Sequence, residues 1–301
     1  MSGHPARRLP TVVVLAVLLA VGGLAACRED TPTVAPTDAV TPASADDFGA
    51  VAFHDPTHVD NRWFPLVPGI RMTWVGHALD DDEKIERRVV FTVTDLVKEV
   101  DGVPSRVIWE LDYTEGELEE AELAFFAQDD SGTVWHMGEY PEEYDEGEIV
   151  KHPGWIAGLQ GALPGIHMPA SPALDTPSYA QGWGPQVGWD DRGDTYALGA
   201  QTCTPVDCYD DVLVNREFSR SEAGAFQLKY YAPGVGNVRI GWGGPDEDEH
   251  EVLVLSELVT LDADALAAVR DAALAQEADA YRLSPALYGT TAPAEQSPGP
   301  A

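Results

Sequence analysis

The side chains that could carry out chemistry in this sequence are carboxylates, histidines and three cysteines, and they fall in no strong catalytic motif. The sequence contains no G-x-S-x-G nucleophile motif, no P-loop and no dinucleotide-binding glycine motif. His54 and His58 have the i, i+4 spacing that on a helix would place both rings on one face. The intervening Asp55-Pro56-Thr57 predicts a turn instead. We therefore predict no metal, no cofactor and no catalytic residue, and we favour a binding function over catalysis.

Acidic residues gather in four short clusters: Asp80–Glu83, Glu142–Asp145, Asp190–Asp194 and Asp246–Glu249. Carboxylate oxygens are suitable ligands for calcium, but no cluster has the spacing of a calcium-binding EF-hand loop. Solvated loops that keep the domain soluble are the favoured interpretation. A hydrolase that works through two carboxylates stays open as an alternative, because a sequence does not show how far apart they lie in space.

Cys27 closes a segment with the features of an export signal. Arg7 and Arg8 precede the apolar stretch Thr11–Val21, which is too short to span a bilayer as a stable helix. Leu24-Ala25-Ala26-Cys27 resembles the lipobox of bacterial lipoproteins and matches it at every position. The resemblance implies cleavage before Cys27 and a diacylglyceryl thioether on its sulfur, with stable anchoring to the outer side of the cell membrane. The alternative is an ordinary secretory cleavage site followed by a chance cysteine.

The two remaining cysteines, Cys203 and Cys208, have the spacing C-x4-C. In an exported chain, the first expectation is a disulfide that closes this short turn. Two free thiols are the alternative. A zinc or redox site is disfavoured because there is no second cysteine pair and redox centres prefer C-x-x-C.

Tryptophans provide the candidate ligand contacts. Trp183 and Trp242 each stand between two glycines, so that a bare indole ring could stack on a sugar. The segment His152–Arg192 is rich in glycine and proline and lacks strand patterns apart from a short one near Tyr179, and such long segments within a domain are usually functional. These features give four candidate ligand-binding residues: Trp155, Trp183, Trp189 and Trp242.

Strands must position these residues, since turn signals recur about every ten residues along the middle of the chain. Two-residue turns are predicted at Asp101-Gly102 and Glu115-Gly116, and a further hairpin turn at Asp145-Glu146-Gly147. The predicted strands are Ile70–Ala78, Ile85–Val100, Val103–Tyr113, Leu118–Ala127, Thr133–Met137, Asp211–Phe218, Ala225–Tyr231, Asn237–Trp242 and Glu251–Leu261. One helix is predicted over Ala263–Arg282, with Asp262 as its cap and an apolar stripe of Leu266, Val269, Ala273 and Leu274.

The composition sets limits on the class of protein. The chain has 301 residues, of which 44% are hydrophobic, which is enough for a buried core. It carries 51 acidic and 18 basic side chains, a net charge of −33, so nucleic acid is excluded as a partner by repulsion. We predict a signal peptide over residues 1–26, a lipidated disordered tether over 27–48, one domain over 49–283 and a disordered tail over 284–301.

Two segments resemble parts of uncharacterised exported bacterial proteins that are rich in β-structure. Val59–Gly69 matches the pattern D-N-x-[YW]-F-P-L-x-P-G, and Lys229–Gly236 contains Y-Y-A-P-G-V-G. The resemblance implies a mainly β domain with a curved sheet like those of lipoprotein carriers, and it carries over no catalytic residue.

The predicted fold is mainly β, a single antiparallel meander that forms a curved sheet or half-barrel with one C-terminal helix packed on it. A helix across such a sheet would leave a concave apolar face. We therefore expect an exported, membrane-anchored module that binds an apolar ligand or a partner in the cell envelope. A carbohydrate-binding surface lipoprotein and a carboxylate-dependent hydrolase are the alternatives.

Overall fold

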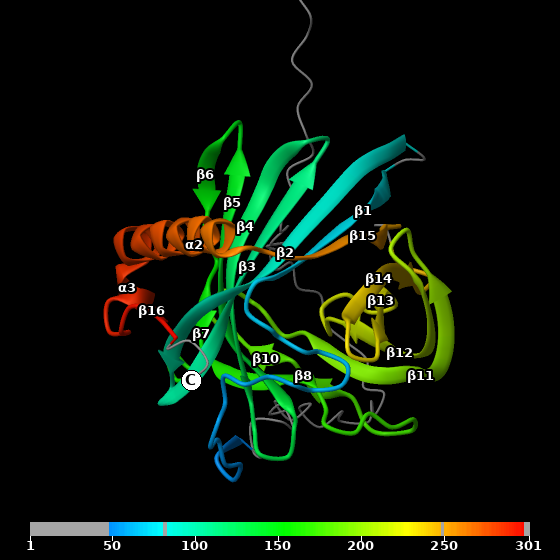
Figure 1. The fold of residues 1–301 in the computed structure, drawn as a ribbon, viewed down its shortest axis with the longest axis horizontal. Coiled ribbons are helices and arrows are strands. Elements are labelled where there is room, and N and C mark those ends of the chain that lie inside the picture. The colour runs from blue at the N-terminus through cyan, green and yellow to red at the C-terminus, as the bar shows by residue number, and fades with distance from the viewer. Residues whose placement is uncertain (1–47, 81–82, 248–249, 298–301) are drawn as a thin grey trace, which may run out of the picture. The chain divides into compact units, whose positions relative to one another are not determined.

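The computed structural model of the chain describes residues 48–80, 83–247 and 250–297. Within them, one antiparallel sheet of 16 strands curls round into a nearly closed barrel (Figure 1). The sheet runs in the order β10-β8-β5-β4-β3-β2-β1-β15-β14-β13-β12-β11-β9. The predicted mainly β fold, with one long C-terminal helix, is therefore confirmed. No helix in the described part of the chain is long and apolar enough to cross a membrane.

The first nine strands are β1 (Ile70–Asp80), β2 (Glu83–Val100), β3 (Val103–Thr114), β4 (Glu117–Gln128), β5 (Val134–Asp145), β6 (Glu148–Lys151), β7 (Trp155–Ile156), β8 (Leu163–Met168) and β9 (Tyr179–Ala180). The elements after them are β10 (Gly182–Trp183), β11 (Arg192–Cys203), β12 (Cys208–Phe218), β13 (Phe226–Ala232), β14 (Gly236–Gly243), β15 (Val252–Thr260), α2 (Ala263–Leu283), α3 (Pro285–Tyr288) and β16 (Glu295–Gln296).

Three hairpins turn on an acidic residue followed by glycine, as the sequence predicts. In Asp101-Gly102, Glu115-Gly116 and Glu146-Gly147 both residues have positive φ, between 50° and 88°. Two successive left-handed residues define the type I′ turn, whose twist matches that of paired strands. These turns fix the registers of β2 with β3, β3 with β4 and β5 with β6.

The barrel closes through one short segment, Tyr179–Trp183. Its first half, β9, pairs with β11, and its second half, β10, pairs with β8, so the two ends of the sheet meet at Gln181. The strands approach closely here because Gly165 and Gly182 have no side chains. A Cβ on Gly165 would lie 2.1 Å from the backbone nitrogen of Gly182, which leaves room for glycine alone.

β11 was not predicted, nor were the short strands within His152–Arg192 apart from one near Tyr179. β11 pairs with β12 through three register shifts, between Thr195 and Thr202. Each bulge breaks the two-residue alternation that identifies a strand in a sequence. β7, β9 and β10 have two residues each, which is too short to show any period.

Helix α2 packs on the outer face of the sheet (Figure 1). Its Asp262 cap accepts a hydrogen bond from the backbone N–H of Ala265, as predicted. Val269 and Ala273 of the predicted stripe are buried, and Ala280 continues it. This interface also buries Gln276, whose side chain accepts a bond from the Trp109 indole on β3 and donates one to the carbonyl of Ala121 on β4.

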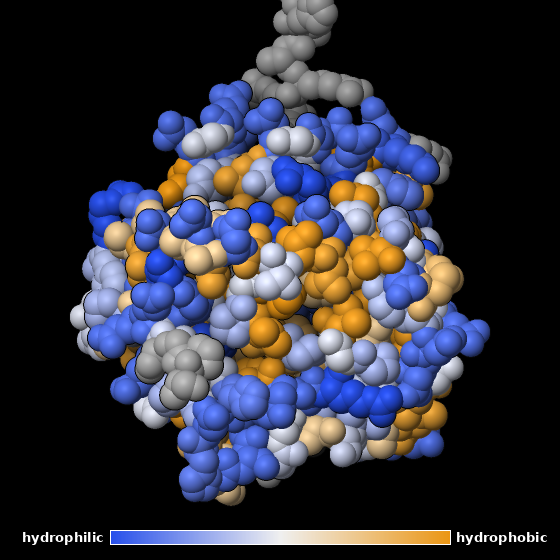
Figure 2. All heavy atoms as spheres, in the orientation of Figure 1, coloured by the Kyte–Doolittle hydropathy of each residue, from blue (hydrophilic) through white to orange (hydrophobic). Residues whose placement is uncertain are grey.

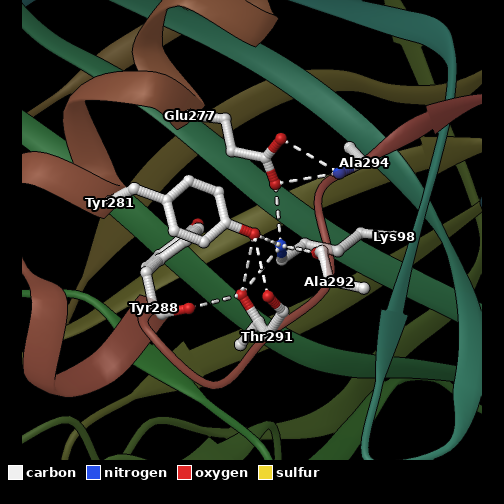
Figure 3. Close-up of polar contacts among 7 residues, drawn as sticks. All are labelled: Lys98, Glu277, Tyr281, Tyr288, Thr291, Ala292 and Ala294. Atoms are coloured by element: carbon white, nitrogen blue, oxygen red, sulfur yellow. Dashed lines mark hydrogen bonds and ion pairs between the residues drawn. The ribbon is translucent and has the colours of Figure 1, made fainter.

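The chain after α2 is packed onto the barrel over residues 284–297, a segment that belongs to the predicted disordered tail over 284–301. Lys98 of β2 is fully buried, and its Nζ lies 2.7 Å from Oε1 of Glu277 on α2 and 2.7 Å from the carbonyl oxygen of Ala292 (Figure 3). Glu277 also accepts a bond from the N–H of Ala294. The buried ammonium thus orders the segment that follows the helix, and Tyr288 is buried beside it.

Candidate functional site

The barrel interior contains a cavity of about 320 Å³. Figure 2 shows hydrophobic side chains gathered in the middle of the viewed face, in the region that the curved sheet surrounds in Figure 1. Inside, however, the lining is divided between apolar and acidic groups. In the described part of the chain it includes one lysine and seven carboxylates: Glu110, Asp112, Glu122, Glu139, Asp191, Glu217 and Glu251.

The alternation of β3 and β4 places the acidic groups inside. Trp109 and Leu123 point outward to the core beneath α2, so their neighbours Glu110 and Glu122 point inward. Glu110 lies directly opposite Glu122 in the register of the two strands, and Asp112 lies opposite Glu120. Like charges at directly opposed positions destabilise a sheet, so this wall of the barrel is electrostatically unfavourable by itself.

Burial favours the protonated forms of these carboxyls. Glu110 and Glu122 are half-buried, and their remaining surface faces the cavity. Burial raises the pKa of Glu110 to about 8, and the neighbouring Asp112 adds to the shift. Burial also raises the pKa of Glu122 well above its usual value, with repulsion from Glu139 as the next cause. The pKa of Asp112 rises to about 6, mainly through burial, although Arg87 opposes the shift.

Three carboxyl groups of the cavity already have a counter-ion. Arg87 lies 3.9 Å from Asp112 and 3.5 Å from Glu251. Glu217 Oε2 on β12 lies 2.6 Å from Nζ of Lys229 on β13, and its Oε1 accepts a hydrogen bond from Gln181 at 3.0 Å. Burial alone would raise the pKa of Glu217, but the Lys229 ammonium holds that pKa below its usual value. Glu217 is therefore ionised, and Gln181 binds it to the closure segment.

Two histidines line the cavity beside the acidic wall. Burial lowers the pKa of His136 to about 3 and that of His167 to about 4, so both rings are neutral. His136 is only 6% exposed, stacks on Phe126 with ring centroids 4.9 Å apart, and has Nε2 3.6 Å from Glu139 Oε2. Its Nε2 makes no hydrogen bond within the described residues. A buried polar atom without a partner is unusual and suggests a place for a ligand group.

The part of the wall next to the acidic strands is apolar, and Phe91 of β2 lies directly beside Glu110 of β3 in the sheet. Met72 and Trp74 of β1, Val89 and Phe91 of β2, and Leu253 of β15 line it. The rings of Trp74 and Phe91 meet edge to face, with centroids 6.1 Å apart and planes at 84°. Together the two walls make an amphipathic cavity, in place of the wholly apolar concave face that was expected.

Only one of the four predicted ligand-binding tryptophans lines this cavity. That residue is Trp189, and Trp155 packs behind it, 2% exposed, with ring centroids 5.0 Å apart. Trp183 on β10 is half-buried, whereas Trp242 on β14 is 37% exposed and stacks on His250 at 3.7 Å. β10 and β14 are not neighbours in the sheet, so Trp183 and Trp242 are not on adjacent strands.

The segment His152–Arg192 nevertheless contributes to the cavity. Four of its residues, His167, Gln181, Trp189 and Asp191, line the wall. Asp191 belongs to the predicted acidic cluster Asp190–Asp194, and burial raises its pKa to about 6, with repulsion from Glu217 as the next cause. The strand-borne acids Glu110 and Glu122 were missed, although acids at every second position of two neighbouring strands are visible in the sequence.

The other predicted positions lie apart from the cavity. His54 and His58 are exposed in a loop, and His54 binds Asp130 instead of a second histidine. The described histidine, cysteine, aspartate and glutamate residues form no group of three or more that could hold a metal ion. Cys203 and Cys208 are joined by a disulfide across the β11–β12 hairpin. Cys27 lies outside the described residues, as do parts of the Asp80–Glu83 and Asp246–Glu249 clusters.

No protein-family model and no curated protein matches this sequence. Among solved structures, the chain is similar to a candidate exported protein with a YmcC-like fold from Bacteroides fragilis, at 12% identity and a TM-score of 0.39. It is also similar to a candidate lipoprotein from Parabacteroides distasonis, at 16% identity and a TM-score of 0.30. Each match covers 66% of this chain and 99% of the other. At this level of similarity neither structure carries an argument about the function of this chain.

Proposed function

We propose that this protein is an exported lipoprotein, anchored outside the cell membrane through Cys27, whose barrel binds a small molecule in its interior without catalysis. The observation that carries the binding function is the cavity of about 320 Å³ inside a preformed barrel. Because a dry cavity of about 150 Å³ is enough to hold benzene, this one has room for a larger molecule.

The site is built on rigid elements. Its walls come from strands whose outer faces are packed beneath α2 or paired in a continuous sheet. A site held by strands keeps its shape before the ligand arrives, which lowers the ordering cost of binding. The segment Tyr179–Trp183, with which the sheet closes, includes Gln181, a residue that lines the cavity.

Export is supported by the lipobox around Cys27 and by the disulfide of Cys203 with Cys208, a bond that persists in oxidising compartments. A short tether would place the domain clear of the membrane surface. The fatty anchor and the barrel thus have separate tasks, retention of the protein and binding of the ligand.

A carboxylate-dependent hydrolase is the second candidate, and Glu110 is the observation that favours it. A carboxyl that stays protonated near neutral pH can act as a general acid, provided that an ionised partner faces it. Glu217 is ionised, but Lys229 and Gln181 occupy its oxygens, and Asp112 lies beside Arg87. Binding without turnover therefore fits the groups better.

Native mass spectrometry of the full chain, released from membranes in mild detergent, tests the binding function. We expect a species heavier than the protein by the mass of one small molecule. Val235→Trp, which fills the cavity from the β13–β14 turn, should abolish that species. Val150→Trp, on the exposed side of β6, should retain it. Equal occupancy in both variants, with equal melting temperatures, would remove the cavity as the site.

The anchor is tested separately with Cys27→Ser. We expect the unaltered protein to enter the detergent phase and to incorporate labelled palmitate, whereas the variant should enter the aqueous phase unlabelled. Equal partitioning of the two proteins would refute the lipid anchor and leave the cavity argument intact.

A further inference from the structure

We infer that the ligand of the barrel cavity is an amphipathic organic cation, with an amino group at the acidic wall of β3 and β4 and an apolar body against β1 and β2. This inference rests on the proposed function and specifies its ligand class.

The first argument is that two opposed carboxyls of the cavity lack a cation. Of the seven carboxyl groups that line the cavity in the described part of the chain, Glu217 pairs with Lys229, and Arg87 lies 3.5 Å from Glu251 and 3.9 Å from Asp112. The side chains of Glu110 and Glu122 have no hydrogen bond or ion pair with any other described residue. Ionised groups in such a place are costly unless a cation pairs with them. A single ammonium between two opposed carboxyls can donate one hydrogen bond to each.

The second argument is the vacant partner at His136. This residue is only 6% exposed, and it lines the cavity. Its Nε2 has no hydrogen-bond partner among the described residues. A neutral imidazole offers one nitrogen as an acceptor and the other as a donor. An amine, which carries several N–H donors, can bond an acceptor nitrogen as well as the carboxyl of Glu139, whose Oε2 lies 3.6 Å from that Nε2.

The third argument is the apolar part of the cavity lining. The same cavity has an apolar wall with the Trp74 and Phe91 rings, which can hold a hydrocarbon chain or an aromatic ring. Ring faces also attract cations, so the two walls are compatible with one charged amphiphile. A bare metal ion would leave the apolar wall unused, and no three described side chains are grouped to hold one.

Three probes of equal size and different charge test the inference: 4-phenylbutylamine, 4-phenylbutan-1-ol and 4-phenylbutanoate. Their binding to the full chain in detergent is followed by titration calorimetry and by tryptophan fluorescence, since Trp74 and Trp189 line the cavity. We expect the amine to bind at least about tenfold more tightly than the alcohol, and the carboxylate to bind most weakly, because a charge-assisted hydrogen bond contributes about 1.5–3 kcal/mol.

The matched variants are Glu110→Gln/Glu122→Gln and, as control, Glu117→Gln/Glu148→Gln. Both double variants replace two ionisable carboxyls by amides, but Glu117 and Glu148 are exposed. We expect the first to lose about tenfold or more in amine affinity with little change for the alcohol, and the second to keep the preference. Melting temperatures confirm folding, and the glutamine pair should fold well because it removes a repulsion.

Other outcomes separate the two proposals. If the alcohol or the carboxylate binds as tightly as the amine, the cation preference is refuted while the cavity remains a binding site. If no probe binds but native mass spectrometry detects a molecule that Val235→Trp excludes, the amine class is refuted and the proposed function stands. If neither assay detects a ligand, both proposals fail.

Discussion

Replacing Glu110 by glutamine should stabilise the ligand-free domain at neutral pH and have little effect in acid. Glutamine has the shape of a protonated glutamate but does not ionise. In the folded barrel, burial and Asp112 raise the pKa of Glu110 from 4.5 to about 8, whereas the unfolded chain ionises the same carboxyl near 4.5. The folded state therefore binds more protons than the unfolded state between these two values, and stability falls as pH rises through that window.

The size of the effect follows from that window. At about pH 7 the native Glu110 keeps its proton, while the unfolded chain gains about 1.36 kcal/mol for each pH unit above 4.5, which is at most about 3.4 kcal/mol. Glu110 is only half-buried, and its exposed part faces the cavity, so solvent screening reduces the expected gain to about 1–2 kcal/mol. Below about pH 4.5 the gain should vanish, because both states are protonated.

The charged groups that act on Glu110 from the surrounding strands are the same in both proteins: Asp112, Glu120, Glu122, Glu139 and Lys229. The difference between wild type and variant therefore isolates Glu110. Urea unfolding of Glu110→Gln, wild type and the exposed control Glu117→Gln across the pH range gives the required free energies. A variant equal to wild type at neutral pH, or one whose gain persists unchanged in acid, would contradict an inward, desolvated Glu110.

Three further predictions concern the packing around the barrel. Lys98→Met should lower the free energy of unfolding by about 3–5 kcal/mol, because Glu277 would stay buried without its cation, and the double variant with Glu277→Leu should recover part of that loss in urea titrations. Gly182→Ala should destabilise the barrel more than Gly188→Ala, since both positions have positive φ but only the first would bring a Cβ within 2.5 Å of the Trp155 ring. Thermal unfolding of the two variants measures the difference, and equal losses would show that the close approach is unimportant. Replacing both Cys203 and Cys208 by serine should cost no more than about 2 kcal/mol, as expected for a short closed loop, and a larger loss would assign the disulfide a wider role.

Local signals in the sequence were sufficient for most of the sheet. The acid–glycine turns at Asp101-Gly102 and Glu115-Gly116 specify their own hairpins, and β2, β3 and β4 alternate clearly enough to be located within about three residues. The helix could also be predicted from the sequence, because its cap and its composition are local signals. β11 was not, since three bulges interrupt its alternation. Closure of the barrel also escaped prediction, because Gly165 and Gly182 meet only in the folded chain.

The same limitation explains why the strand-borne acids of the cavity were missed. The order Trp109-Glu110-Leu111-Asp112 has the two-residue alternation of a half-buried strand, and such a pattern ordinarily sends its acids into water. In this fold, α2 covers the outer face and takes the apolar side chains, so the acids point into the barrel. Nothing within a single strand determines which face will be enclosed, because enclosure depends on where β9 and β10 close the sheet.

That arrangement has a consequence for how the site should be interpreted. A barrel selected for stability alone would place apolar residues opposite each other at the positions of Glu110 and Glu122. β3 and β4 do so two residues along, where Ile108 lies opposite Ala124. Instead the chain keeps two opposed carboxyls and leaves His136 Nε2 unpaired beside Glu139. Each of these features costs free energy in the empty barrel, and one bound amine would relieve both. Binding should then release protons near neutral pH, because the amine favours the ionised carboxyls. Calorimetric titration of 4-phenylbutylamine in buffers of different ionisation enthalpy would detect this release, and its absence would show that the amine does not reach Glu110 and Glu122.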